Sequence, residues 1–233
     1  MISSLPFAGF PKQTITFFRQ LAQNNTKMWF DQNKEMYEQQ VLVPARDFIL
    51  ALGLKLKKIA PGVQADPRVN KSLFRLNRDI RFSHDKTPYK THLGLWFWEG
   101  SRPRMECSGF YFHLEPERFM LGIGLYALPK DTLEIYRRSV VHPKHGPALA
   151  KAIAGIKKNK DYYIGGQHFK KTPQGYDPSH KNAEYLLYDG LYAGRELPVS
   201  ADLFSEGLVD LCFDHYKNMV PLHRWLLALT ERV

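Results

Sequence analysis

The sequence predicts an α+β fold, a single domain in which an antiparallel β-sheet is flanked by N-terminal and C-terminal helices. Three observations support this prediction. Apolar residues recur at helical spacing in the first part of the chain, they alternate with polar residues in the middle, and helical spacing returns towards the end. With 233 residues, of which 44% are hydrophobic, the chain can bury a sizeable core, and we expect one domain over residues 1–233.

Three helices are predicted before the middle of the chain. The first spans residues 14–23 and ends at the turn signal Asn24-Asn25. The second starts near Thr26. The third begins at Pro44, which suits a first helical turn, and ends at Pro61-Gly62.

The middle of the chain predicts a β-hairpin over residues 107–126, with Pro116-Glu117 as the turn and Glu115 opposite Arg118. One face of this hairpin is apolar and should face the core: Phe110, Phe112, Leu114, Phe119, Leu121 and Ile123. The other face is nearly free of large aliphatic side chains: Gly109, Tyr111, His113, Met120, Gly122 and Gly124. Either a helix packs closely on this second face, or a ligand lies on it.

The remainder predicts helices over residues 129–141 and 146–158, followed by a loop with brief strands over residues 161–181. A short helix with Ser179 as its candidate N-cap comes next. A longer helix should start at Ser200 with Asp202 in its early turns, and Pro221 should kink or interrupt it.

The charge of the chain indicates an anionic partner. Lys and Arg number 33 against 23 Asp and Glu, a net charge of +10. Residues 55–104 alone hold twelve Lys or Arg against four acids, a net of +8. Such a block suits a phosphorylated or carboxylate-bearing small molecule or a nucleic acid, and the alternative is a basic protein without such a partner.

Several classes of protein are not indicated. The two cysteines, Cys107 and Cys212, have no zinc-binding or disulfide pattern, so we expect no metal, no cofactor and a reducing cytoplasm. The first fourteen residues do not resemble a secretory leader, and no apolar stretch reaches the length of about 18 residues that a membrane span needs. The sequence gives no indication of the oligomeric state.

The stretch "RDIRFSHDKTPYKTH", residues 78–92, carries the candidate site. Arginine forks bind phosphate or carboxylate in a bidentate manner and lysine binds as a point charge, so a loop with both can hold an oxyanion. The anion-binding candidates in and beside this stretch are Arg75, Arg78, Arg81, Lys86, Tyr89 and Lys90. The supporting candidates are Asp79, Asp85, His92, Tyr111 and His113.

Two alternatives to a small-molecule site stay open. Asp79 and Asp85 can neutralise the neighbouring cations, in which case the stretch is an internal salt-bridge clasp of a structural or interaction protein. The abundance of Lys, Arg and aromatic residues also allows a nucleic-acid-binding module, although the sequence has no RRM, KH, helix-turn-helix or zinc-finger pattern. His84 and His92 are candidates for acid–base chemistry, but no catalytic motif is found, so whether the protein is an enzyme stays open.

These segments together resemble the uncharacterised family called domain of unknown function 2461. The strongest likeness is "FRLNRDIRFSHDKTPYKTH", residues 74–92. Further likenesses are found at residues 21–38, 109–126 and 170–187, so the family-like region spans about residues 7–230. The resemblance implies neither an activity nor a cofactor.

Overall fold

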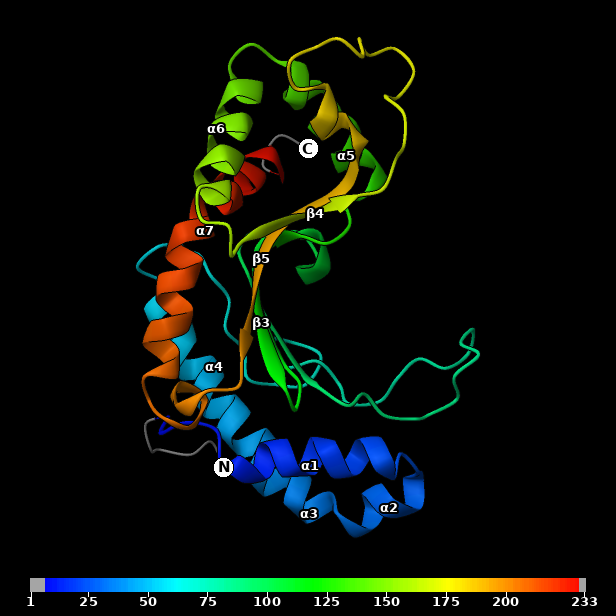
Figure 1. Cartoon of the computed structure of the whole chain (residues 1–233), viewed down its shortest axis with the longest axis vertical. Coiled ribbons are helices and arrows are strands. Elements are labelled where there is room, and N and C mark those ends of the chain that lie inside the picture. The colour runs from blue at the N-terminus through cyan, green and yellow to red at the C-terminus, as the bar shows by residue number, and fades with distance from the viewer. Residues whose placement is uncertain (1–6, 231–233) are drawn as a thin grey trace. The chain divides into compact units, whose positions relative to one another are not determined.

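A computed structural model describes residues 7–230 and confirms the predicted α+β fold, with helices before and after a five-stranded antiparallel sheet (Figure 1). The strand order is β1-β2-β3-β5-β4. The strands are β1 (Leu93–Trp98), β2 (Gly109–Leu114), β3 (Arg118–Leu125), β4 (Tyr163–Gln167) and β5 (Tyr188–Pro198). Residues 1–6, part of the stretch from which we expect no secretory leader, lie outside the described residues.

The helices fall into three groups along the chain. The N-terminal group is α1 (Lys12–Gln23), α2 (Lys27–Gln32), α3 (Lys34–Tyr37), the π-helical turn η1 (Glu38–Leu42) and α4 (Val43–Leu56). Between the strands lie the short 3₁₀ turns η2 (Arg104–Glu106) and η3 (Ala183–Leu187) and the helices α5 (Lys130–Val141) and α6 (His145–Lys157). The chain ends with the turn η4 (Ala201–Phe204) and the long helix α7 (Leu208–Thr230). Within residues 7–230 no helix is both long and apolar enough to cross a bilayer.

The chain divides into two compact units. Unit 1 is formed by residues up to Phe97 together with Tyr111–Met120 and Glu196–Asp214, and unit 2 by Trp98–Phe110, Leu121–Arg195 and the residues from His215 onward. The predicted stretch 78–92 therefore belongs to unit 1.

Unit 1 is held together by an aromatic core beneath the N-terminal helices. α1 buries Ile15, Phe17, Phe18 and Leu21 on one face. The hairpin contributes Phe112, whose ring lies 4.9 Å from that of Phe48 in α4 and 6.0 Å from that of Phe10. The core face of β2 and β3 is thus the apolar face that the alternation predicts.

The predicted second helix is interrupted, which is a difference from the sequence expectation. It starts as predicted, because the hydroxyl of Thr26 accepts a hydrogen bond from the backbone N–H of Trp29 at 3.3 Å. It stops at Asn33, where the side-chain amide donates to the carbonyl of Trp29 at 2.8 Å. Asparagine competes in this way with helical hydrogen bonding, and the chain then continues through α3 and η1 to α4.

The hairpin forms at the predicted place. The backbone N–H of Glu115 donates to the carbonyl of Arg118 at 2.8 Å, which closes the turn at Pro116-Glu117. All six residues of the predicted core face are buried. Gly124, on the other face, has φ +130, and a Cβ there would lie 2.3 Å from the carbonyl oxygen of Leu191 in β5. At this position the glycine is required by the neighbouring strand.

Pro221 lies inside α7 without ending it, because residues around it such as Leu222 and Leu226 are fully buried and their packing outweighs one missing hydrogen bond. Two expectations for the C-terminal part are wrong. Ser179 does not cap a helix, because its N–H and hydroxyl both donate to the carboxylate of Asp177, at 2.8 and 2.7 Å. Asp202 lies in η4, before the start of α7.

Candidate anion-binding site

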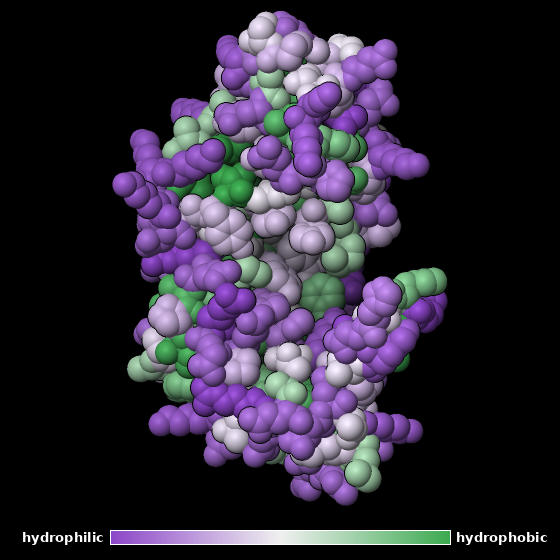
Figure 2. Space-filling model, turned by 45° about the vertical axis from the view of Figure 1, so that its right-hand side comes forward, coloured by the Kyte–Doolittle hydropathy of each residue, from purple (hydrophilic) through white to green (hydrophobic). Residues whose placement is uncertain are grey.

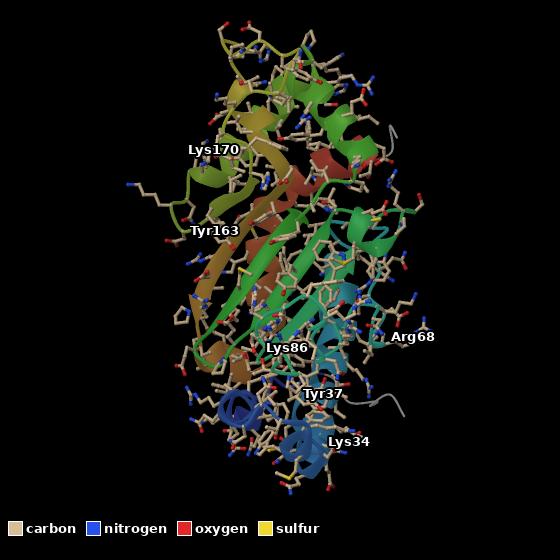
Figure 3. All side chains as sticks on the ribbon, turned by 90° about the vertical axis from the view of Figure 1, so that its right-hand side faces the viewer. Lys34, Tyr37, Arg68, Lys86, Tyr163 and Lys170 are labelled. Carbon is tan, nitrogen blue, oxygen red and sulfur yellow. The ribbon has the colours of Figure 1, made fainter. Side chains whose placement is uncertain are left out.

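Residues 74–92 form a basic arm that projects from unit 1 (Figure 1, teal). Its two sides run antiparallel: the N–H of Arg78 donates to the carbonyl of Pro88 at 2.8 Å, and the N–H of Lys90 donates to that of Leu76 at 2.9 Å. Asn77 pairs with Tyr89 between these bonds. Figure 3, in which the arm points towards the viewer, labels Lys86. We call residues 79–86 the tip and the remainder the root.

The root of the arm is anchored on α2 and the preceding turn. The side chain of Asn25 donates to the carbonyl of Tyr89 at 2.9 Å and accepts from its N–H at 3.1 Å. The Tyr89 ring is buried and lies 4.5 Å from the ring of Phe30. Tyr89 was predicted as an anion-binding candidate, and its ring is placed as an anchor instead of on the exposed surface.

The first side of the arm alternates as a strand does. Phe74 and Arg78 are half-buried and Leu76 is buried, whereas Arg75 and Asn77 are exposed. This alternation sets the direction of each cation. Arg75, Arg81 and Lys86 are exposed, whereas Arg78 and Lys90 are half-buried.

Both acids of the arm form ion pairs. Arg78 binds Asp85 and the hydroxyl of Thr87. Arg81 binds Asp79 in a bidentate manner, at 2.9 and 2.7 Å. The hydrogen bonds from Arg81 lower the pKa of Asp79 to about 2, and those from the N–H and hydroxyl of Thr87, followed by Arg78, lower the pKa of Asp85 to about 2. Both carboxylates are therefore ionised at neutral pH.

The Arg81–Asp79 pair is open to solvent, whereas the Arg78–Asp85 pair is open only on the side of the acid. Side-chain exposure is 76% for Arg81 and 45% for Asp79, but 26% for Arg78 and 59% for Asp85. Exposed ion pairs contribute little to stability, because water screens them and ordering two side chains costs entropy. The exposure of the Arg81–Asp79 pair does not fit a clasp that holds the fold together, whereas Arg78 is held between Asp85 and Thr87 and shapes the arm.

The polar face of the hairpin carries a second group of candidates beside the root. Tyr111 and His113 of β2 are joined by a hydrogen bond of 2.8 Å between the Tyr111 hydroxyl and Nδ1 of His113. The other ring nitrogen of His113, Nε2, lies 2.9 Å from the carboxylate of Glu115. Arg118 donates to the same carboxylate at 3.0 Å. The order along this relay is hydroxyl, imidazole, carboxylate and guanidinium.

The direction of the hydrogen bonds in this relay follows from its chemistry. Burial raises the pKa of Glu115, but hydrogen bonds from His113 and Arg118 outweigh that effect and hold the pKa below its usual value. An ionised carboxylate only accepts, so in neutral His113 the proton is on Nε2, and Nδ1 accepts from Tyr111. Burial and the charge of Glu115 raise the pKa of Tyr111 to about 12, so its hydroxyl keeps its proton. The relay is therefore a fixed chain of hydrogen bonds from the Tyr111 hydroxyl to the Glu115 carboxylate.

His92 connects the arm to this relay. Its ring stacks on that of His113, with centroids 4.2 Å apart. Burial, followed by the charges of His113 and Lys90, lowers the pKa of His92 to about 4. His92 is therefore neutral at physiological pH. The structure thus brings together His92, Tyr111 and His113, which the sequence named only as separate supporting residues.

A second relay lies buried in unit 2 and was not predicted. The Ser108 hydroxyl lies 2.9 Å from Nδ1 of His223, and Nε2 of His223 lies 2.8 Å from the carboxylate of Glu99. Ser, His and Glu in this order are typical of an activated nucleophile. Ser108 and His223 have no exposed surface, however, so a substrate has no access to them in this structure. The relay joins α7 to the residues before β2.

Unit 2 also has a shallow groove of about 570 Å³ between α6 and α7. Its lining includes Lys151 and Trp225 next to Ala148 and Gly155. None of the predicted site residues lines this groove. No group of three or more His, Cys, Asp or Glu side chains within residues 7–230 is placed to hold a metal ion.

The comparisons with known proteins bear on the family. A family model described as "Conserved hypothetical protein (DUF2461)" matches residues 13–225, which include the arm and both relays. The comparison with curated proteins finds no match. The resemblance noted from residues 74–92 is thereby confirmed, and the match carries no description of a ligand or reaction.

Proposed function

We propose, from the premise that the chain belongs to the DUF2461 family of conserved hypothetical proteins, that its basic arm binds an anionic ligand. The observation that carries this proposal is the direction of the cations: Arg75, Arg81 and Lys86 are exposed on one projecting segment. Residues 74–92 hold five Lys or Arg against two acids, which leaves a net charge of +3. A phosphate or carboxylate that approaches the arm meets several donors at once.

The ion pairs within the arm are compatible with such binding. Arg81 already presents its guanidinium fork to one oxyanion, the carboxylate of Asp79. A ligand phosphate of higher charge can take the place of that carboxylate at little cost, because the pair is exposed. Asp79 and Asp85 then act as intramolecular competitors that keep the cations oriented in the absence of ligand.

The root supplies rigidity to this proposed site. Asn25 and the buried ring of Tyr89 fix the arm to unit 1, so less conformational freedom is lost when a ligand binds. Lys90 lies above the ring of Phe74, with its Nζ 5.5 Å from the centroid. Arg78 and Lys90 of the root are thus half-buried, whereas Arg75 of the root and Arg81 and Lys86 of the tip are exposed to a ligand.

We assign the protein to the cytoplasm as part of this proposal. Both cysteines, Cys107 and Cys212, are unpaired and buried, which suits a reducing compartment. Fractionation of cells that carry the chain would test this assignment, and recovery outside the cytoplasm would count against it.

The proposal is tested by calorimetry and thermal shift against inorganic polyphosphate, nucleotides and sugar phosphates. A ligand that binds the native state raises the melting temperature according to its concentration over Kd. The triple variant Arg75→Ala, Arg81→Ala, Lys86→Ala should lose this effect. The matched control removes three exposed lysines of unit 1 outside the arm, Lys12→Ala, Lys27→Ala and Lys58→Ala, and should keep it. Equal losses in both variants would show that only net charge matters and would contradict the proposal.

A further inference from the structure

Phe82, at the tip of the arm, is the most solvent-exposed aromatic residue of the part of the chain that the structure describes. The residue is 94% exposed, compared with 79% for Tyr126. Figure 2 shows hydrophilic residues over most of the arm and hydrophobic atoms at its end. A singly exposed apolar side chain is ordinary on a protein surface, but an aromatic ring within a cationic segment is the combination that binds single-stranded nucleic acids.

The tip is not an unstructured loop. Nζ of Lys86 donates to the carbonyl of Ile80 at 2.9 Å and ties the two sides of the tip together. Arg81 is fixed by Asp79, and its guanidinium lies 5.8 Å from the centroid of the Phe82 ring. The ring is therefore presented beside a cation in a defined arrangement.

We infer that the ligand of the arm is a single-stranded nucleic acid, and that Phe82 stacks on one of its bases. This inference rests on the proposed function, since the cations that bind the phosphates are those of the arm. An aromatic ring stacks on any base, and neighbouring Arg and Lys follow the backbone. Phe82 supplies the ring, and Arg75, Arg81 and Lys86 supply the phosphate contacts.

Single strands suit this tip better than duplexes. In a duplex the faces of the bases are covered by their neighbours, so a ring at the end of an arm finds a base only where it is unpaired. A lipid surface fits less well. Interfacial segments bury several apolar side chains, whereas in the tip Phe82 is accompanied by two carboxylates, Asp79 and Asp85.

The test measures the fluorescence anisotropy of a labelled oligothymidylate. Its length of about fifteen nucleotides is close to the number that one single-strand-binding surface covers. Inorganic polyphosphate, which has charge but no bases, serves as the competing ligand. Phe82→Ala should weaken binding of the oligonucleotide roughly 5- to 160-fold, the range that base–aromatic stacking gives. Its affinity for polyphosphate should not change. Phe82→Tyr keeps the ring and should bind as the wild type does.

The outcomes separate this inference from the proposed function. If Phe82→Ala binds the oligonucleotide as the wild type does while polyphosphate is still bound, stacking is refuted and the proposed function stands. If the wild type binds neither ligand, both fail. If Phe82→Ala loses binding to phosphatidylserine vesicles and not to the oligonucleotide, the partner is a membrane and the inference is overturned. Because Phe82 is exposed, Phe82→Ala should keep the melting temperature of the wild type. This measurement shows that the variant is folded.

Discussion

Asn25 offers the sharpest test of how the arm is anchored. In Asn25→Ala the N–H and the carbonyl of Tyr89 both lose their side-chain partner. Each such partly buried hydrogen bond contributes about 1 kcal/mol, so the variant should lose about 2 kcal/mol of local stability. At 1.36 kcal/mol for each factor of ten, this corresponds to about 30-fold faster exchange of the amides that depend on the root.

Hydrogen exchange followed by NMR provides the assay. The amides of Tyr89, Arg78 and Lys90 should lose protection in Asn25→Ala, because all three belong to the paired part of the arm. The amide of Leu21 in α1 serves as an internal reference and should keep its protection. Asn25→Asp keeps the acceptor for the Tyr89 N–H but loses the donor, so its effect should be intermediate. Unchanged protection at Tyr89 in Asn25→Ala would refute the anchoring role.

Three further predictions follow from the charges and the buried relay. Asp79→Asn should leave the melting temperature nearly unchanged and tighten anion binding severalfold, because the exposed carboxylate no longer competes for Arg81; a marked loss of stability without tighter binding would instead support the internal clasp. The pKa of His92 is about 4 in the folded state and about 6.5 in the unfolded state. Between these two pH values the unfolded chain binds more protons than the folded protein, so the stability should fall as the pH drops from 6.5 to 4. Denaturant titrations should show a flatter pH dependence in His92→Phe over this range, and identical curves would contradict the assignment. Ser108→Ala leaves Nδ1 of the buried His223 without its donor and should cost about 1–3 kcal/mol, or roughly 2–4 °C in melting temperature for each kcal/mol; an unchanged melting curve would show that the relay is not structural.

Local patterns predicted much of the fold. The helix end at Asn24-Asn25 and the hairpin turn at Pro116-Glu117 each depend on neighbours in sequence, and both are confirmed. β5 was not predicted, because its glycines weaken the strand pattern: Gly190 and Gly194 lie beside the buried Leu191 and Ala193. Those glycines are set by contacts with residues distant in sequence, since a Cβ at Gly190 would lie 1.9 Å from the carbonyl oxygen of Tyr126.

The two relays also differ in whether local spacing or only tertiary packing brings their residues together. Tyr111 and His113 lie on one face of β2 and Glu115 follows directly after the strand, so period-two spacing indicates that all three lie together. Ser108, His223 and Glu99 are different. His223 is 115 positions from Ser108 and 124 from Glu99, and no local pattern relates residues so far apart. Only tertiary packing brings them together.

The most direct test of the central claim, that the arm binds an anion, is the salt dependence of affinity for the oligothymidylate. Single strands release about 0.7 counterions for each phosphate neutralised, so contacts from Arg75, Arg81 and Lys86 predict a slope of about −2 in log K against log salt. The Arg75→Ala, Arg81→Ala, Lys86→Ala variant should bind with a slope near zero, and the Lys12→Ala, Lys27→Ala, Lys58→Ala variant should keep the wild-type slope. Equal slopes in the wild type and the arm variant would contradict the account.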